Sequence, residues 1–342
     1  MSPIKGHTLP ATLLFSLMLL ILSTACTPAP GAPTFTPVPE MTPTPVLEMT
    51  PTPAATPVEP FRIIGYFTDA GVVEIVPFDR LTHINYAFVT PNEDGSLGPF
   101  ANSWKLKRLV EVAHQHNVRV LPSVGGWGWD AQFEAMAGDP VARKAFVQNI
   151  IAFVNEYNLD GVDIDWEFPD AGQSARNYAA LMHELRAALP EGKLLTAAVP
   201  ALGSNADNFL PETFTDVDFL NLMVYDGDQG AGHSPYQYAL DSLAYWSAKG
   251  LPKEKTVLGV PFYARPGEAT YRKLVKADPT ASQKDSMDYL GMTVYYNGIP
   301  TIVEKTKLAI EKASGMMFWT LEGDTLDNTS LIKAIYDTAY GK

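Results

Sequence analysis

Cysteine is almost absent from this chain of 342 residues, and basic residues are scarce. The single cysteine is Cys26, so an intramolecular disulfide is excluded and stability must come from packing. The 25 Lys and Arg residues are outnumbered by 38 Asp and Glu residues, which gives a formal net charge of −13. This deficit of positive charge argues against nucleic acid or an anionic membrane surface as a partner, whereas a neutral polymer would not be repelled.

The N-terminal region also lacks a hydrophobic run long enough to span a bilayer. Its apolar stretch, residues 13–22, is about half as long as the ~20 residues that a membrane helix needs, and is typical of a signal peptide. It ends in Leu-Ser-Thr-Ala-Cys at residues 22–26, which resembles the cleavage site of a bacterial lipoprotein. We therefore predict a signal peptide over residues 1–26 and lipidation of Cys26. Ordinary cleavage near Ala25, which would leave a free thiol, is the alternative.

Residues 27–60 contain little that can form a core. They are rich in Pro and Thr, and Glu-Met-Thr-Pro-Thr-Pro occurs at residues 40–45 and again at 48–53. Such a segment is expected to be an extended polyproline-II spacer, and at about 3 Å per residue it would reach up to ~100 Å. The folded catalytic domain is therefore predicted over residues 61–342, which has the size of one barrel of eight βα units.

The most informative stretch is residues 159–169, Leu-Asp-Gly-Val-Asp-Ile-Asp-Trp-Glu-Phe-Pro. As a β-strand, it places Asp163, Asp165 and Glu167 on one face, about 6.5 Å apart, with apolar side chains on the other face. Because a strand with such an apolar face is expected to be central and covered, like charges and burial should raise at least one carboxyl pKa. A carboxylic acid that stays protonated near neutral pH is suited to general acid catalysis.

Strand and helix patterns alternate along the rest of the domain, which predicts βα units and a parallel sheet. Besides the acidic strand, strands are expected at residues 63–67, 83–89, 118–124, 194–199, 219–225, 257–263 and 316–320. Helices are expected near residues 104–117, 140–154, 178–189, 237–249, 301–313 and 328–339. A doubly wound sheet would normally have a glycine-rich phosphate loop after its first strand, and none follows here. We therefore predict a (β/α)8 TIM barrel with its active site at the C-terminal ends of the strands.

Chemically distinctive residues occur at these strand ends. They are Tyr66, Phe88, Gly125, Gly126, Trp127, Met223, Tyr225, Asp226, Tyr263, Arg265, Met317 and Trp319. Each alone has an ordinary explanation, as barrel filling or as a surface charge. The motifs S-x-G-G at residues 123–126, M-x-Y-D at 223–226 and Y-x-R at 263–265, with the acidic strand, together resemble family 18 glycoside hydrolases, the chitinase family.

The resemblance implies a role for four catalytic residues. Glu167 would protonate the leaving glycosidic oxygen and then act as the base on the attacking water, while the 2-acetamido oxygen of the substrate is the nucleophile. Asp165 would hold the acetamido N–H and stabilise the positive charge of the intermediate. Asp163 would lie one layer deeper and share a proton with Asp165, so that the two carboxyls titrate as a pair. Tyr225 would donate a hydrogen bond to the acetamido carbonyl.

The other residues at the strand ends are expected to bind substrate, with Asp226 at the distorted sugar and Trp319 as its hydrophobic floor. No metal and no cofactor are expected, because the six His and the one Cys form no cluster with metal-ligand spacing. Only about fifty residues separate Arg265 from Gly315. The insertion domain that deepens the cleft in larger relatives should therefore be absent or vestigial, which predicts a more open groove.

The predicted function is endo-acting hydrolysis of β-1,4 linkages between N-acetylglucosamine units of chitin or chitooligosaccharides, with retention and an oxazolinium intermediate. We expect a monomer that is secreted or anchored at the surface of a bacterium. An endo-β-N-acetylglucosaminidase acting on N-glycans or peptidoglycan-like polymers would use the same residues. A non-catalytic sugar-binding surface protein is the alternative from another class, and Glu167 argues against it.

Overall fold

The structure is a computed structural model that describes residues 60–342. The predicted signal peptide, the lipidation site Cys26 and nearly all of the predicted spacer lie outside the described residues. No helix among residues 60–342 is long and apolar enough to cross a membrane.

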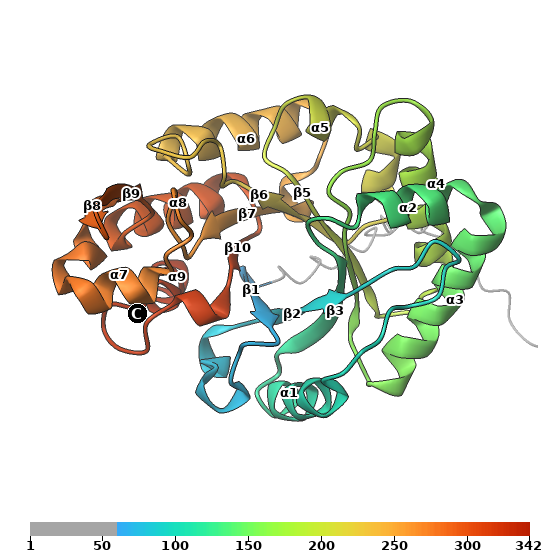
Figure 1. Ribbon diagram of the computed structural model, residues 1–342, viewed down its shortest axis with the longest axis horizontal. Helices are drawn as coiled ribbons and strands as arrows, with labels where there is room; N and C mark the ends of the chain where they lie inside the picture. The colour runs from blue at the N-terminus through green and yellow to red at the C-terminus, as the bar shows by residue number, and fades with distance from the viewer. Residues whose placement is uncertain (1–59) are drawn as a thin grey trace, which may run out of the picture. The chain divides into compact units, whose positions relative to one another are not determined.

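Eight parallel strands close into a barrel in the order β1-β10-β7-β6-β5-β4-β3-β2 (Figure 1). The strands are β1 (Arg62–Thr68), β2 (His83–Val89), β3 (Arg119–Gly125), β4 (Gly161–Asp165), β5 (Leu194–Pro200), β6 (Phe219–Met223), β7 (Thr256–Pro261) and β10 (Gly315–Trp319). This confirms the predicted (β/α)8 TIM barrel. The β4 register pairs Asp163 with Ser123 of β3 and with Thr196 of β5, which surrounds the acidic strand with neighbours on both edges.

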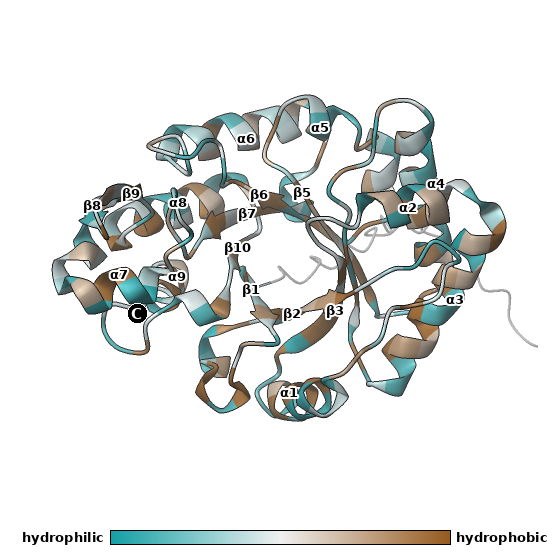
Figure 2. Cartoon of the chain, viewed as in Figure 1, coloured by the Kyte–Doolittle hydropathy of each residue, from teal (hydrophilic) through white to brown (hydrophobic). Residues whose placement is uncertain are grey.

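Helices surround the barrel and turn their apolar faces toward it (Figures 1 and 2). They are α1 (Ser103–Gln115), α2 (Asp130–Gly138), α3 (Pro140–Glu156), α4 (Gln173–Ala188), α5 (Ser204–Asp207), α6 (Tyr236–Ala248), α7 (Tyr271–Ala277), α8 (Ile299–Lys312) and α9 (Leu331–Tyr340). Asp139 caps α3 by accepting a hydrogen bond from Val141 N, and Pro140 begins the helix. Between β1 and β2 the chain forms two short 3-10 turns in place of a helix, Val73–Ile75 and Phe78–Arg80.

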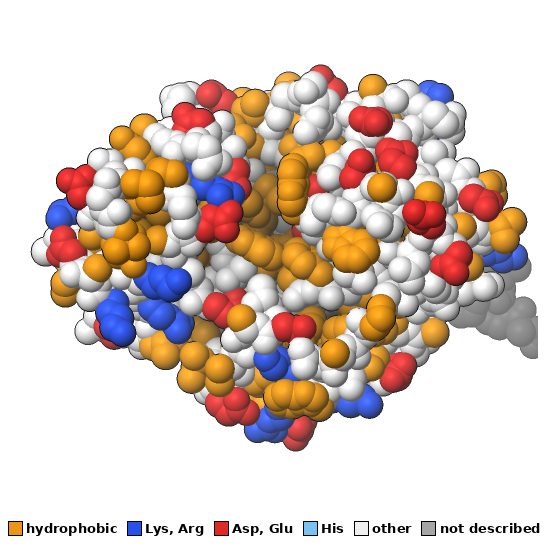
Figure 3. Space-filling model, viewed as in Figure 1, with side chains coloured by type: hydrophobic (Ala, Val, Ile, Leu, Met, Phe, Trp, Pro, Cys, Tyr) orange, Lys and Arg blue, Asp and Glu red, His pale blue; other side chains and the backbone are white. Residues whose placement is uncertain are grey.

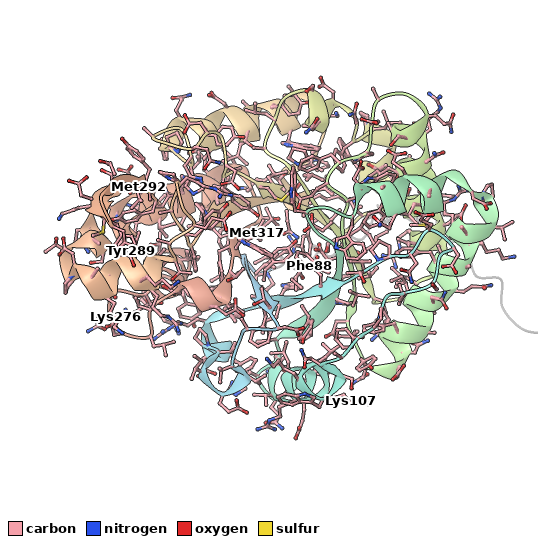
Figure 4. The ribbon with its side chains drawn as sticks, in the orientation of Figure 1. Phe88, Lys107, Lys276, Tyr289, Met292 and Met317 are labelled. Carbon is pink, nitrogen blue, oxygen red and sulfur yellow. The ribbon has the colours of Figure 1, made fainter. Side chains whose placement is uncertain are left out.

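A two-stranded hairpin occupies the region between β7 and β10. Its antiparallel strands are β8 (Ser286–Tyr289) and β9 (Met292–Tyr295). Figure 4 shows Tyr289 and Met292 at the outer edge of the molecule, far from Phe88 in the centre of the barrel. The hairpin and α7 are small elements at the position where an absent or vestigial insertion domain was predicted, and neither element was itself predicted from the sequence.

The barrel strands have an apolar outer face and a mixed inner face. Outward residues such as Val162, Ile164 and Trp166 of the acidic strand region are fully buried beneath the helices. Part of the interior is filled by an apolar cluster of Ile64, Tyr66, Ala87, Phe219, Val257 and Met317. The cluster reaches the acidic strand, because the Tyr66 hydroxyl donates to Asp163, and Asp165 follows at the C-terminal end of β4.

Candidate active site

Asp163 is fully buried in the barrel and is the most heavily hydrogen-bonded carboxylate of the acidic strand. Its Oδ2 accepts hydrogen bonds from the hydroxyls of Tyr66 and Ser123, each at 2.8 Å. Its Oδ1 accepts from the Thr196 hydroxyl at 2.5 Å and from the Asn221 amide at 3.2 Å. Burial raises the pKa of Asp163, and these hydrogen bonds oppose the rise because they stabilise the ionised form. All partners donate, which suits a carboxylate that carries no proton.

Asp165 lies one inward step further along β4 and has a different environment. Its side chain is buried, and its Oδ1 has no hydrogen-bond partner among residues 60–342. Burial, and then the charges of Glu167 and Asp163, raise the pKa of Asp165 well above its usual range. The contrast with the fully satisfied Asp163 favours placing a shared proton on Asp165, where the hydrogen-bond donors are missing.

Glu167 lies two residues beyond the end of β4 and its side chain lines the cleft. Burial and then the charge of Asp226 raise its pKa from the ordinary 4.5 to about 7. Part of the side chain is exposed, so a substrate can reach the carboxyl group. A carboxyl that is accessible and still protonated at neutral pH has the properties of a general acid.

The alternation predicted for residues 162–168 holds through Glu167, which lines the cleft, and through the outward side chain of Trp166. This side chain is fully buried, stacks on Phe133 with ring centroids 5.1 Å apart, and donates from Nε1 to Asp130 of α2 at 2.7 Å. Phe168 was expected on the same outward face, but it lines the cleft beside Glu167. The strand ends at Asp165, so its period of two no longer governs where Phe168 points.

Tyr225 and Asp226 follow the end of β6 and face the acidic strand across the cleft. Burial, and then the neighbouring Tyr263, raise the pKa of Tyr225 well above its usual range, so its hydroxyl keeps its proton and can donate. Asp226 accepts two hydrogen bonds from Arg265, both at 2.8 Å. Burial opposes ionisation of Asp226, but the bonds from Arg265 prevail and hold its pKa well below the usual range. A stable negative charge therefore lies near Glu167 and helps to keep that carboxyl protonated.

Three aromatic rings form the floor of the cleft. Trp319 stacks on Phe88 with ring centroids 5.5 Å apart and packs against Tyr66 at 5.6 Å. The predicted substrate contact of Met317 is not seen, because its side chain is fully buried in the apolar cluster of the barrel interior. An inward residue two positions before a strand end lies one layer lower in the barrel, out of reach of the cleft.

The cleft has a volume of about 940 Å³ and opens on the face shown in Figure 3, where hydrophobic side chains line the hollow. Predicted site residues that line it are Tyr66, Phe88, Trp127, Asp165, Glu167, Met223, Tyr225, Asp226, Tyr263, Arg265 and Trp319. Trp127 is 80% exposed and therefore presents its ring to solvent at the rim.

Gly125 and Gly126 are not part of the cleft lining but allow close packing next to it. A Cβ at Gly125 would lie 2.3 Å from the carbonyl oxygen of Asp165, and one at Gly126 would lie 2.7 Å from the Phe88 ring. Both residues have positive φ angles, of 112° and 86°. They were predicted to let backbone approach a ligand, whereas here they let the end of β3 approach the acidic strand and the aromatic floor.

Several lining residues were not predicted. They include Phe168 after β4, Tyr238 of α6, and Ser204, Asn205, Gln229, Phe262, Glu268 and Thr270 in the segments after β5, β6 and β7. No periodic pattern or motif marks the polar residues of this set, because irregular loops bring them to the cleft. The donors to Asp163 include Thr196, whose only signal is a polar residue on the inner face of an apolar strand.

The comparisons with known proteins agree with this geometry. Residues 62–324 match the family model of the glycosyl hydrolases family 18. The chain belongs to this family. It is therefore a glycoside hydrolase by class, and the resemblance seen in the sequence is confirmed.

Similar proteins include chitinases from distant organisms. Chitinase 1 of Aphanocladium album is 27% identical, and the match covers 78% of this chain and 82% of that protein. The probable endochitinase of Caenorhabditis elegans is 34% identical, but the match covers 58% of this chain and only 40% of that protein. Among solved structures, a chitinase from Bacteroides thetaiotaomicron has a TM-score of 0.74 at 29% identity, covering 83% of this chain and 98% of that one. The GH18 chitinase ChiB of Flavobacterium johnsoniae has a TM-score of 0.73 at 29% identity, and the match covers 82% of this chain and 94% of that one.

Proposed function

We propose that this glycoside hydrolase cleaves β-1,4 linkages between N-acetylglucosamine units of chitin or chitooligosaccharides, at internal positions and with retention of configuration. The observation that carries the proposal is the carboxyl of Glu167, with a pKa of about 7, at the wall of an open cleft. Directly below it lies a second carboxyl, Asp165, with a raised pKa, and opposite lies the protonated hydroxyl of Tyr225.

In the first step, Glu167 donates its proton to the glycosidic oxygen of the departing sugar. The acetamido oxygen of the remaining sugar forms a bond to the anomeric carbon as the glycosidic bond breaks, which gives an oxazolinium ion. In the second step, the Glu167 carboxylate accepts a proton from water, and the water oxygen bonds to the anomeric carbon as the bond from that carbon to the acetamido oxygen breaks, which restores the acetamido group. Glu167 is restored, and the configuration is retained after two inversions.

Asp165 and Tyr225 are proposed to hold the acetamido group. The unpartnered Oδ1 of Asp165 is an acceptor for the acetamido N–H, and the Tyr225 hydroxyl is a donor for its carbonyl. As positive charge develops on the oxazolinium ion, the single negative charge that Asp163 and Asp165 keep between them stabilises it, because the buried setting weakens screening by water. Asp163 supports Asp165 from the layer beneath and has its own hydrogen bonds filled by protein groups.

The polymeric substrate is supported by the shape and composition of the cleft. The floor of Trp319, Phe88 and Tyr66 is suited to the apolar faces of sugar rings, and Trp127 offers a further exposed ring at the rim. Between β7 and α8 the structure has α7, a short 3-10 helix and the small β8–β9 hairpin, so this side of the cleft has no added domain. An open cleft favours binding in the middle of a chain, which is the basis for the proposed endo action.

For the part of the chain outside the described residues, we propose a signal peptide over 1–26, a lipid on Cys26 and an extended spacer over 27–60. The support is the short apolar run, the position of the lone cysteine and the Pro/Thr repeat. The protein would then act as a monomer at the surface of a bacterium, with the catalytic domain of residues 61–342 held away from its anchor.

Product analysis on matched oligosaccharides tests the proposal. Chitin oligomers of N-acetylglucosamine should be cleaved internally, and the first products should retain the β-anomeric configuration in a time-resolved NMR experiment. Fully deacetylated oligomers of the same length should not be turned over, because the nucleophile is missing. Release of glycan from a high-mannose glycopeptide with no action on chitin oligomers would replace the proposed substrate by an N-glycan. Equal rates on acetylated and deacetylated oligomers would rule out the mechanism.

A further inference from the structure

Lys305 of α8 is a completely buried lysine that has no part in the chemistry described above. It makes no ion pair with any residue between 60 and 342. A buried ammonium group without a counter-ion is costly unless hydrogen bonds replace its lost water. The hydrogen-bond acceptors around the Lys305 ammonium group show which part of the chain it holds in place.

The Nζ atom of Lys305 has three acceptors. They are the Ser234 carbonyl at 2.6 Å, the Ser234 hydroxyl at 2.8 Å and the Asn297 side-chain oxygen at 2.8 Å. The Ser234 hydroxyl uses its own hydrogen on the carbonyl of Val224 at 2.5 Å, so toward Lys305 it can only accept. Three acceptors require three N–H donors, which only the protonated lysine supplies. Burial lowers the pKa of Lys305 to about 7, while the charge of Asp285 opposes that change.

Ser234 and its neighbour His233 grip the backbone on both sides of Tyr225. The Ser234 hydroxyl binds the carbonyl of Val224, in the peptide group before Tyr225. The Nδ1 atom of His233 lies 3.1 Å from the N–H of Asp226, in the peptide group after Tyr225. His233 is itself buried, and its Nε2 lies 3.3 Å from the carbonyl of Tyr263.

Residues 224–226, which His233 and Ser234 hold, have little other backbone support. Asp226 has a φ angle of 55°, in the left-handed region that a residue with a side chain adopts at some cost. The regular strand β6 has already ended at Met223, so no ladder of strand hydrogen bonds fixes the next residues. The direction of the Tyr225 side chain therefore depends on the two peptide groups that His233 and Ser234 hold.

We propose that Lys305 is a positioning residue for Tyr225 and Asp226. Its ammonium group fixes Ser234, Ser234 fixes the carbonyl of Val224, and this chain of contacts sets the orientation in which the Tyr225 hydroxyl meets the acetamido group. The inference rests on the proposed function, since that function gives Tyr225 and Asp226 their roles. Lys305 itself touches neither substrate nor reacting atoms, because it is buried behind the loop that follows β6.

The test compares three variants with the wild type on chitin oligomers. Lys305→Met removes all three donors while keeping a side chain of similar length, and Lys305→Gln keeps an amide that donates. Ser234→Ala removes the hydroxyl that links Lys305 to Val224. Thr306→Val is the matched control, because Thr306 is the next residue of α8, equally buried, and its hydroxyl bonds only to Ile302 of the same helix.

Lys305→Met should lower kcat by about 10- to 100-fold per folded molecule, the loss expected when a catalytic group moves by roughly 1 Å. KM should stay within about twofold, since the aromatic floor comes from other strands. This floor binds the sugar equally in the ground state and in the transition state. Lys305→Gln should retain more activity than Lys305→Met. As a single substitution, Ser234→Ala should lower kcat. In the double variant it should add little to the effect of Lys305→Met, because both substitutions break the same chain of contacts.

Hydrogen exchange gives a readout that does not depend on activity. A peptide covering residues 222–230 should exchange faster in Lys305→Met than in the wild type, and at the wild-type rate in Thr306→Val. A purely structural lysine would lower the melting temperature in the same way as the control and leave both kcat and this exchange rate unchanged, which would overturn the proposal. A wild type without activity on chitin oligomers would overturn the proposed function instead, and the exchange rate would still decide whether Lys305 holds the segment.

Discussion

Replacing Glu167 by Gln removes the proton donor while preserving the size of the side chain. General acid–base catalysis is typically worth about 10²–10⁴-fold, which corresponds to roughly 3–5 kcal/mol. Glu167 is assigned both the donation and the later acceptance of a proton, so its loss should cost at least the upper end of that range in kcat. Binding of a chitin oligomer should survive, because the aromatic floor and Arg265 are unchanged.

The same substitution has a second consequence that does not depend on substrate. The carboxyl has a pKa of about 7 in the folded protein and an ordinary value of 4.5. A pKa raised by folding means that the protonated form is favoured in the native state. The relative stability of the native state is therefore highest below pH 4.5 and declines as the pH rises toward 7. At 1.36 kcal/mol per pH unit the full change is on the order of 3 kcal/mol, an upper value because the side chain is partly exposed to solvent.

The assay is thermal or denaturant unfolding of the wild type and of Glu167→Gln at pH 4 and pH 8. Gln does not titrate, so the variant should gain stability relative to the wild type on going from pH 4 to pH 8, by ~1–3 kcal/mol. Wild-type activity should fall as the pH rises through about 7, because the acid must be protonated to donate. Near-normal turnover by the variant would refute the assignment of Glu167 as the acid. A stability difference that is the same at both pH values would refute the raised pKa on which the assignment rests.

Three further substitutions test other parts of the site and the anchor. Asp165→Asn keeps the acid but weakens charge stabilisation, so kcat should fall by about 10²-fold without vanishing, and kinetics of the double variant with Glu167→Gln should show that the two losses do not add. Tyr225→Phe should lower kcat by about 10- to 100-fold with little change in KM, because the lost hydrogen bond is stronger in the transition state than in the bound substrate. Steady-state kinetics measure both constants, and an unchanged kcat would remove Tyr225 from the mechanism. Cys26→Ser should move the protein from the membrane fraction to the soluble fraction, and a wild type that is already soluble would exclude the lipid anchor.

Much of the fold follows from local patterns in the sequence. Strands with continuous apolar character alternate with helices of period 3.6, and this combination allows few architectures other than a parallel sheet covered by helices. The Asp139–Pro140 pair marks the start of α3 because its capping chemistry is local. The hairpin β8–β9 and the helices α2, α5 and α7 escaped prediction, since their stability comes from neighbours in space and their few residues carry no clear period.

The acidic strand shows where the sequence stops being sufficient. Its period of two placed Asp163 and Asp165 on the inner face correctly, as strand geometry requires. The same rule failed for Phe168, because the strand ends before it and the loop turns its ring into the cleft. For Met317 the rule holds, since the residue lies inside the barrel, but its side chain is buried in the apolar cluster and does not line the cleft as the resemblance implied.

The sequence by itself determined which residue types reach the C-terminal ends of the strands, because the order of residues fixes the alternation along each strand. Only the tertiary structure decided what those residues experience. Four donors from β1, β3, β5 and β6 converge on Asp163, while Asp165 next to it lacks a partner for one oxygen. A pKa depends on burial and on charges and donors from distant parts of the chain, so the difference between these carboxyls arises only when the barrel closes.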